Sequence, residues 1–420
     1  MKKTLLKWLR NSEQYTKTDM VYLIGQSGWL LIGQGIIFTS SFLLAWIFAN
    51  FVEPADYGLY KYVLSIATIA TITTVTGLSI ALARAVSQGH SVSLPKLLRI
   101  RILFGLLGTA GLFALAAYYL LVRDNTLLAT LFAVTALWIP FYETFSDYQY
   151  VLQGKRDFKT QTYLRIIQRF TLTGLVILTI VLTRNIIIIT LVFFAASTFS
   201  QYLAFRYTIR KYPTLDDSQT PYKEIIDYGK HTSLQNIFLI GVGQFDKILM
   251  FKLLGPSQLA VYFFAIAIPQ ELQGILGNIN SVAFPKLVNK ESREFKKALL
   301  KKIALFSGLL IIPAILYIVA APYLFTWFFP VYLESILISQ LYVGTILFIP
   351  ASLLWHYFYA VDNKKALWYG TFIGPSSVIL GILIFVPFLG LFGAVLAIYL
   401  RAVLDLAIGL YFFWQKKTGS

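Results

Sequence analysis

Long apolar runs alternate with short polar segments along the whole chain. A transmembrane helix needs about 20 mostly apolar residues to cross roughly 30 Å of hydrocarbon. The pattern predicts twelve such helices, over 22–50, 59–83, 100–122, 126–150, 164–183, 186–206, 229–254, 259–284, 302–329, 335–360, 366–388 and 391–414. The fourth run has a polar second half, and the seventh contains Asp246 and Lys247, so these two fit the pattern least well.

The composition supports an all-α integral membrane protein. Hydrophobic residues make up 57% of the 420 residues and charged residues only 13%, whereas soluble chains carry about 25% charged residues. The chain has no cysteine, which excludes disulfides and thiolate metal sites. Three scattered histidines, His90, His231 and His356, do not suggest a metal cage. We therefore expect neither a metal nor another cofactor.

The net charge of +17 is explained by topology. In a soluble protein such a charge would suggest nucleic-acid binding. Here, an even number of spans places 29 of the 36 Lys and Arg residues on the side that holds both termini. Basic residues collect on the cytoplasmic side of a membrane protein. We therefore expect both termini in the cytoplasm, a place in the cytoplasmic membrane, and no nucleic-acid partner.

The two halves of the chain repeat each other. A shift of 202 residues brings the turn at 54–60 onto 256–262, and it brings 82–84 onto 284–286. Six spans per half give a parallel repeat about an axis normal to the membrane. The sequence thus predicts two six-helix bundles, 1–206 and 229–420, joined by the linker 207–228 and facing a central cavity. The alternative is chance similarity between two apolar helices that follow a proline turn.

Several short motifs resemble one transporter family. The segment 52–62 (VEPADYGLYKY), followed by Gly77-Leu78 and 81–84, resembles the first outer turn and second span of polysaccharide-exporting flippases. These are the Wzx-type members of the multidrug/oligosaccharidyl-lipid/polysaccharide (MOP) exporter superfamily. Asp246-Lys247, 254–256 and 283–286 resemble the second half of the same proteins. The chain departs from the family pattern in Glu53, where glycine is usual, and in Lys61.

The resemblance implies a MATE-like fold and a transport function. Wzx-type flippases move an isoprenoid-diphosphate-linked oligosaccharide from the inner to the outer leaflet of the cytoplasmic membrane. The glycan then enters a surface polysaccharide such as capsule or the O-antigen of lipopolysaccharide. The implied partners are this lipid-linked oligosaccharide, membrane lipids and a polysaccharide polymerase. No cofactor is implied.

Four basic residues in or near spans are candidates for binding the diphosphate: Arg84, Lys247, Lys61 and Arg401. Cationic side chains bind phosphate well, arginine as a fork and lysine as a point charge. Lys61 and Arg84 are separated by about 34 Å of helix, so we expect them at opposite ends of span two. The alternatives are an inner-leaflet anchor for Arg84 and a lysine that snorkels to the interface for Lys61.

Four acidic residues are candidates for coupling transport to H⁺ or Na⁺: Asp246, Glu143, Asp147 and Asp405. Ionisable residues at membrane depth are costly and therefore mark functional sites by default. Glu143 and Asp147 have the i,i+4 spacing of one helix face, where two acids repel unless a proton or cation is near. The alternative for these two is a hydrated position near the headgroups.

The other two acids each have a basic neighbour in the sequence. Asp246 and Lys247 are adjacent, so they point about 100° apart on a helix and cannot both face one neighbouring helix. We expect at least one of them to face a polar cavity. Arg401 and Asp405 have the i,i+4 spacing of an ion pair on one helix face. This pair either lines the cavity or is structural.

Other functions fit the sequence less well. The outer loops are about ten residues or less and no DxD motif occurs in the inner loops, so we expect no enzyme of the glycosyltransferase or polymerase type. A multidrug or cation antiporter of the same superfamily would favour acids in an apolar cavity. A lipid-linked peptidoglycan precursor flippase typically has two more spans. No filter-like glycine repeat suggests a channel.

Overall fold

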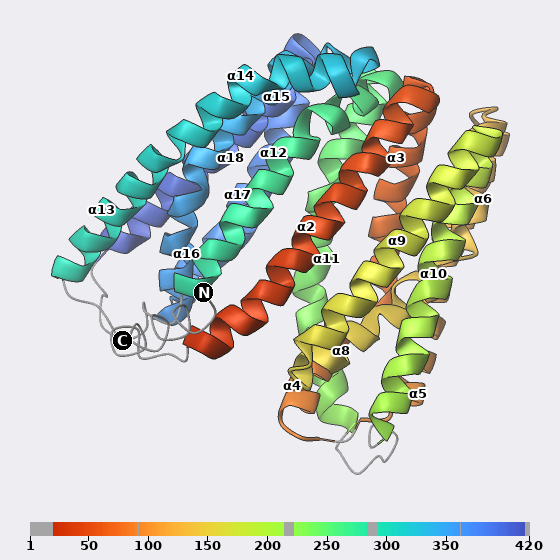
Figure 1. Cartoon of the computed structure of the whole chain (residues 1–420), viewed down its shortest axis with the longest axis horizontal. Helices are drawn as coiled ribbons and strands as arrows, with labels where there is room; N and C mark the ends of the chain where they lie inside the picture. The colour runs from red at the N-terminus through yellow and green to blue at the C-terminus, as the bar shows by residue number, and fades with distance from the viewer. Residues whose placement is uncertain (1–19, 91, 214–221, 284–292, 362, 416–420) are drawn as a thin grey trace, which may run out of the picture. The chain divides into compact units, whose positions relative to one another are not determined.

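The computed structural model describes residues 20–90, 92–213, 222–283, 293–361 and 363–415 (Figure 1). These residues form helices joined by short turns, with no β-strand among them. The predicted all-α class is therefore confirmed. The end of the family-like segment 283–286 lies outside the described residues, as does much of the predicted linker.

Helices occupy every one of the twelve predicted runs. In the first half they are α2 Met20–Phe51, α3 Pro54–Ala70, η1 Thr71–Thr74, α4 Gly77–Ser87, α5 Leu94–Leu121, α6 Thr126–Ala136, α7 Ile139–Tyr142, η2 Thr144–Ser146, α8 Asp147–Gly154, α9 Phe158–Thr183 and α10 Ile186–Lys211. In the second half they are α11 Tyr222–Leu254, α12 Pro256–Ala283, α13 Arg293–Leu309, α14 Ile311–Phe328, η5 Pro330–Tyr332, α15 Ser335–Val343, η6 Gly344–Ala351, α16 Ser352–Ala360, α17 Lys364–Leu389 and α18 Leu391–Trp414.

The helices are long and apolar enough for a membrane. Within the described residues, seven helices are long and apolar enough to cross a membrane. Counting each of two bent helix pairs as one span raises the number to nine. The helices α2, α11 and α12 occupy the other three predicted runs. Large apolar side chains face outward, such as Leu121 at 80% and Phe388 at 84% exposed. Outward leucine and phenylalanine at this density suit contact with lipid.

Span two is broken, although the sequence pattern predicts one continuous helix over 59–83. The turn Thr71–Thr74 interrupts it, and the two parts of the span are bent by 54°. The hydroxyls of Thr73 and Thr74 donate to carbonyls three residues earlier, at 2.8 and 2.7 Å. Such bonds compete with the helical ladder, and Val75 then takes a left-handed conformation with φ of 55°. The threonine run therefore ends α3 inside the span.

Spans four and ten also depart from a regular helix. In span four the two parts are bent by 44°, and Thr144 Oγ1 donates to the carbonyl of Pro140 at 2.6 Å. Span ten contains the 3-10 segment Gly344–Ala351, with Pro350 inside it. The shift of 202 residues that relates the two halves places Thr144–Ser146 within Gly344–Ala351. The irregular segments therefore occur at matching positions of the repeat.

Residue contacts group the chain into two compact units. The first unit is Met1–Ile47 with Ala70–Ile237, and the second is Phe48–Ile69 with Phe238–Ser420. The predicted bundles 1–206 and 229–420 divide the chain by sequence position instead, so that division stays a prediction. Helices α10 and α11 extend into the predicted linker 207–228, because α10 ends at Lys211 and α11 begins at Tyr222.

Each unit has its own apolar core. In the first unit, Leu78 and Leu82 of α4 pack with Val151 of α8 and Phe205 of α10. In the second, Leu354 and Phe358 of α16 pack with Phe413 of α18. Consecutive helices α9 and α10 lie side by side in the first unit, as α17 and α18 do in the second (Figure 1).

Asp157 caps the N-terminus of α9 and links it to the end of α10. Its carboxylate accepts hydrogen bonds from the backbone of Thr160, from Lys211 Nζ at 2.7 Å and from Tyr212 Oη at 2.8 Å. Partial burial opposes ionisation, but these hydrogen bonds outweigh it and lower the pKa of Asp157 to about 2. Because the pKa is depressed, the stabilisation is present at neutral pH and is lost progressively as pH falls from the ordinary carboxyl range down through about 2.

The turns that the repeat relates are in contact within the second unit. Proline is the first residue of both α3 and α12, at Pro54 and Pro256, a position where its missing N–H costs no helical bond. The aromatic rings of Tyr62 and Phe251 stack with centroids 3.8 Å apart. Gly58 lies so close to the second turn that an added Cβ would be 1.9 Å from the carbonyl oxygen of Pro256.

We expect Gly58→Ala to destabilise the protein, because the new methyl group cannot fit beside the Pro256 backbone. Overpacking of this kind costs about 1–3 kcal/mol. The thermal unfolding midpoint of the purified protein should fall. Gly111→Ala is the matched control, because a Cβ at this position in α5 meets no atom within 4 Å. Alanine is otherwise favoured over glycine in a helix, so equal unfolding midpoints for the two variants would contradict this packing.

Candidate functional site

A cavity of about 560 Å³ lies in the second unit. Helices α11, α12, α17 and α18 contribute to its walls, together with α15, η6 and α16. Its polar and charged lining residues are Asp246, Lys247, Tyr262, Gln270, Gln273, Tyr342, Thr345, Ser352, Arg401 and Asp405. An apolar wall with a few converging polar groups is the usual form of a ligand site. This cavity is therefore the candidate site.

One ion pair in the cavity comes from α11. Lys247 Nζ lies 3.2 Å from Asp246 Oδ1 and donates to the carbonyl of Gly243 at 2.7 Å. Tyr262 Oη of α12 donates to Asp246 Oδ2 at 3.4 Å. The side chains of Lys247 and Asp246 are 17% and 16% exposed. The expectation is that at least one of these adjacent residues faces a polar cavity, and both line it.

The second ion pair comes from α18. Arg401 Nε lies 3.4 Å from Asp405 Oδ2 on the same helix face, and the predicted i,i+4 pair is confirmed. Asp405 Oδ1 has no hydrogen-bond partner among the residues that the structure describes. Gly374 of α17 leaves room for it, since a Cβ there would lie 2.1 Å from Asp405 Oδ1. Arg401 is 48% exposed, so its guanidinium remains accessible.

Uncharged polar groups and aromatic rings complete the lining. Gln273 Nε2 donates to Thr345 Oγ1 at 2.7 Å, and Gln270 Nε2 lies 3.4 Å from Tyr342 Oη. Thr345 belongs to the 3-10 segment of span ten, so the irregular backbone of that span faces the cavity. Trp355 adds an indole ring to the wall. Amides, hydroxyls and aromatic faces are the groups that bind sugars.

Lys61 does not line this cavity. Its ammonium group lies over the ring of Tyr57 at 5.2 Å and over the ring of Phe263 at 4.9 Å. Such cation–π contacts stabilise a lysine in an aromatic setting. Lys61 therefore belongs to the turn region where α3 meets α12.

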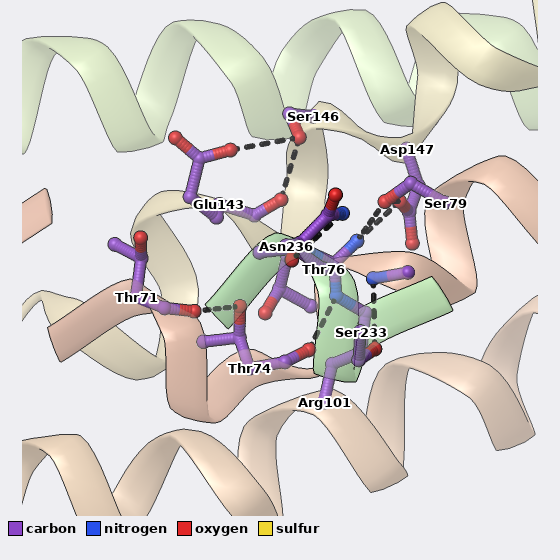
Figure 2. Close-up of polar contacts among 12 residues, drawn as sticks. Thr71, Thr74, Thr76, Ser79, Arg101, Glu143, Ser146, Asp147, Ser233 and Asn236 are labelled. Atoms are coloured by element: carbon purple, nitrogen blue, oxygen red, sulfur yellow. Dashed lines mark hydrogen bonds and ion pairs between the residues drawn. The ribbon is translucent and has the colours of Figure 1, made fainter. Parts of the chain in front are cut away.

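Glu143 and Asp147 lie in the first unit, in different surroundings from those predicted. The expectation of one regular helix face is wrong, because η2 separates α7 from α8 between the two acids. Asp147 is fully buried and pairs with Arg101 (Figure 2). Glu143 instead accepts a hydrogen bond from Ser146 Oγ at 3.2 Å. Arg84 lies in the last turn of α4 in the same unit and is exposed.

The structure thus brings together Lys247, Asp246, Arg401 and Asp405 in one cavity. It places Lys61 elsewhere in the second unit, and Arg84, Glu143 and Asp147 in the first. The substrate and ion roles of these residues stay predictions.

Sequence reasoning missed Arg101, which lies at the start of the predicted span 100–122 and is one of the 29 basic residues assigned to the side of the termini. Arg101 is 1% exposed and pairs with Asp147. A signal for this pair was present, because a carboxylate inside a span requires a partner. Gln270 and Gln273 were also missed, although their i,i+3 spacing puts both on one face of α12.

These features define a class and a family. The fold is that of the MOP superfamily, an all-α membrane protein with irregular spans at matching positions of its two halves. The chain matches the family described as "polysaccharide biosynthesis protein" over residues 47–330, and it belongs to that family. The resemblance to polysaccharide-exporting flippases is thereby confirmed. No curated protein matches the chain.

Solved structures of the superfamily share this fold. The chain is similar to the lipid II flippase MurJ in an inward closed conformation, with a TM-score of 0.69, 14% identity and coverage of 93% of this chain and 88% of that one. For a MOP superfamily transporter from Pyrococcus furiosus the TM-score is 0.60, with 14% identity and coverage of 92% and 95%. For an inward-facing multidrug MATE transporter the TM-score is 0.59 and the identity is 14%, with coverage of 90% of this chain and 94% of that one.

Proposed function

We propose that the protein is a flippase for an isoprenoid-diphosphate-linked oligosaccharide. The observation that carries this proposal is the cavity of the second unit, which holds two basic groups, two amides and aromatic rings among apolar walls. The cations Lys247 and Arg401 suit a diphosphate, since both lysine and arginine bind phosphate. The amides and rings suit the sugars. The family description, polysaccharide biosynthesis, supports this class of cargo.

The charge balance of the cavity suggests how transport is driven. Lys247 and Arg401 are each paired with a carboxylate, so the four side chains together carry no net charge. A diphosphate adds negative charge that would lie near Asp246 and Asp405, and like charges repel more strongly in a partly dehydrated site. A proton or Na⁺ taken up at these carboxylates removes the repulsion. Binding of the cargo and of the coupling ion would then favour each other, as linkage requires.

The same charges argue against a multidrug antiporter for cationic compounds. Such a site would need carboxylates without basic neighbours, whereas both cavity carboxylates have one. A peptidoglycan precursor flippase shares the diphosphate chemistry, and the similarity of the fold to that of MurJ agrees with it. The family description favours an oligosaccharide destined for surface polysaccharide. We therefore propose a polysaccharide polymerase as the downstream partner, and no enzymatic activity.

Within the cell we propose a place in the cytoplasmic membrane, with both termini in the cytoplasm. The two six-helix bundles 1–206 and 229–420 would give alternating access, joined by 207–228. Arg84 and Lys61 remain candidates for contacts with the cargo as it enters and leaves. Glu143 remains a candidate for coupling, since Asp147 is committed to Arg101.

Transport itself is tested by reconstitution. Purified protein in liposomes should move a fluorescent isoprenoid-diphosphate-linked oligosaccharide between leaflets, which is measured as the fraction accessible to an external lectin. A lipid-linked peptidoglycan precursor and a cationic dye serve as competing substrates. Preferred movement of either one would replace the proposed cargo.

The Lys247→Ala, Arg401→Ala double variant should bind the lipid-linked oligosaccharide more weakly. Each charge-assisted hydrogen bond contributes about 1.5–3 kcal/mol, so loss of both predicts a rise in Kd of at least about 100-fold. Lys252→Ala is the control, because Lys252 lies in the last turn of α11 but does not line the cavity. Unchanged affinity in the double variant, measured with the same folded fraction, would contradict the role of these cations.

The Asp246→Asn, Asp405→Asn double variant should uncouple cargo binding from the ion. Asparagine removes the negative charge that a proton or Na⁺ neutralises in the wild type. Wild-type affinity should therefore increase as pH falls or as Na⁺ replaces K⁺, and variant affinity should change less. Because the diphosphate itself titrates, the two proteins are compared at each pH. Equal pH and Na⁺ dependence in both would exclude these carboxylates as the coupling site.

Topology is tested with reporter fusions. An alkaline phosphatase fusion at Asp124 or Gly255 should be active, because we expect these turns outside, and a fusion at Lys159 or Lys365 should be inactive. A fluorescent protein should give the reverse pattern. One position with the opposite readout would overturn the span order.

A further inference from the structure

The break in span two leaves backbone groups that other elements must satisfy. An interrupted helix has N–H and C=O groups without helical partners, and buried backbone groups are almost always paired. The carbonyl of Thr74 accepts a hydrogen bond from Arg101 Nε at 3.1 Å. The N–H of Gly77 donates to Ser233 Oγ at 2.9 Å. One side of the break is thus held by α5, and the other by α11.

Arg101 joins three elements at this break (Figure 2). Besides its bond to Thr74, its Nη1 donates to Ser79 Oγ of α4 at 2.9 Å and to Asp147 Oδ1 at the start of α8. Ser79 Oγ in turn donates to Asp147 Oδ1 at 2.7 Å. Arg101 and Asp147 are 1% and 0% exposed. A planar guanidinium can reach all three partners at once, which a single ammonium group cannot.

The start of α4, which this network holds, receives the inner part of α11. Ser233 and Asn236 of α11 approach Gly77 and Thr76, with Asn236 Nδ2 at 3.4 Å from Thr76 Oγ1 (Figure 2). The backbones are in close contact, because a Cβ at Gly77 would lie 2.3 Å from the carbonyl oxygen of Gly229. Contact this close depends on the exact direction of the first turn of α4.

We propose that Arg101 and Asp147 are positioning residues, which hold the broken span two so that α11 can dock on it. The N–H of Gly77 is free to bond Ser233 only because the break ends the helical ladder there, and the Arg101 network fixes the geometry of that break. Without the network, the first turn of α4 can rotate, and the close contact with α11 is lost. Because α11 also carries Asp246 and Lys247, its docking would affect transport, and this consequence rests on the proposed function. The docking of α11 on α4 does not depend on the proposed function.

The chain allows a direct test, because it contains no native cysteine. The Thr76→Cys, Asn236→Cys pair reports docking, since the two side chains are in contact. Oxidative cross-linking of the full-length protein in membranes is measured by its rate. We expect this rate to fall about tenfold in Arg101→Met and in Asp147→Asn, since breaking a buried ion pair disrupts the local structure strongly. In Arg101→Lys the cross-linking rate should fall nearly as far, because lysine keeps the charge but lacks the planar guanidinium that reaches several partners.

Two controls separate docking from folding. Lys211→Met breaks a partly exposed ion pair of the same unit and should leave the rate unchanged. The Tyr62→Cys, Phe251→Cys pair, whose rings stack in the second unit, should cross-link equally fast in every background. Where a single variant fails to reach the membrane, Arg101→Met with Asp147→Leu avoids an unpaired buried charge and is measured instead. We expect the same tenfold loss for the Thr76–Asn236 pair.

An unchanged Thr76–Asn236 rate in these variants would overturn the proposal. So would an equal fall of both cysteine pairs in the charge-free double variant, because it would show a general effect on folding. Neither readout uses the cargo or the cavity residues. A failure of the proposed function would therefore appear in the binding and transport assays, and a failure of this inference only in the cross-linking.

Discussion

A charge inside a membrane-spanning segment must be compensated within the protein, and this constraint shapes both units. Removing an ion from water is expensive unless an opposite charge and hydrogen bonds replace the hydration. The described spans meet the requirement with three acid–base pairs that differ in exposure. Arg101–Asp147 is fully buried, Lys247–Asp246 is partly exposed, and Arg401–Asp405 is the most open. The buried pair has no access to a ligand, whereas the two in the cavity can exchange partners with one.

The non-helical segments within the spans are either buried in the protein or line the cavity. Non-helical segments are tolerated at membrane depth only where they are buried in protein or line a cavity, and both cases occur here. At the break Thr71–Thr74, the carbonyl of Thr74 accepts a hydrogen bond from Arg101, which is itself paired with Asp147. The segment Gly344–Ala351 contributes Thr345 to the cavity. The irregular backbone of span two is thus held by packing inside the protein, whereas that of span ten contributes to a site.

The sequence predicted the fold well because hydropathy is a local property. Twelve apolar runs became helices, and the i,i+4 spacing of Arg401 and Asp405 gave their pair correctly. The breaks were missed, because a threonine run in an apolar stretch lowers hydropathy only slightly. The partner of Asp147 was missed for another reason: Arg101 lies 46 residues away and begins a span, where the distribution of charge assigns it to the membrane surface. Pairing between spans depends on packing, which local patterns do not contain.

The buried pair Arg101–Asp147 is better explained by a role in orienting span two after its break than by a contribution to the free energy of unfolding. Replacing a buried ion pair with apolar residues of similar volume is often neutral or stabilising, so stability alone gives no reason for Arg101 in a span that is otherwise apolar. Apolar side chains, however, cannot bond the open carbonyl of Thr74, and they do not fix the direction of a hydroxyl such as that of Ser79. Arg101 does both through one rigid group, with Asp147 as its counter-charge. The pair therefore sets the direction in which span two continues after its break, and that direction determines where α11 lies against it.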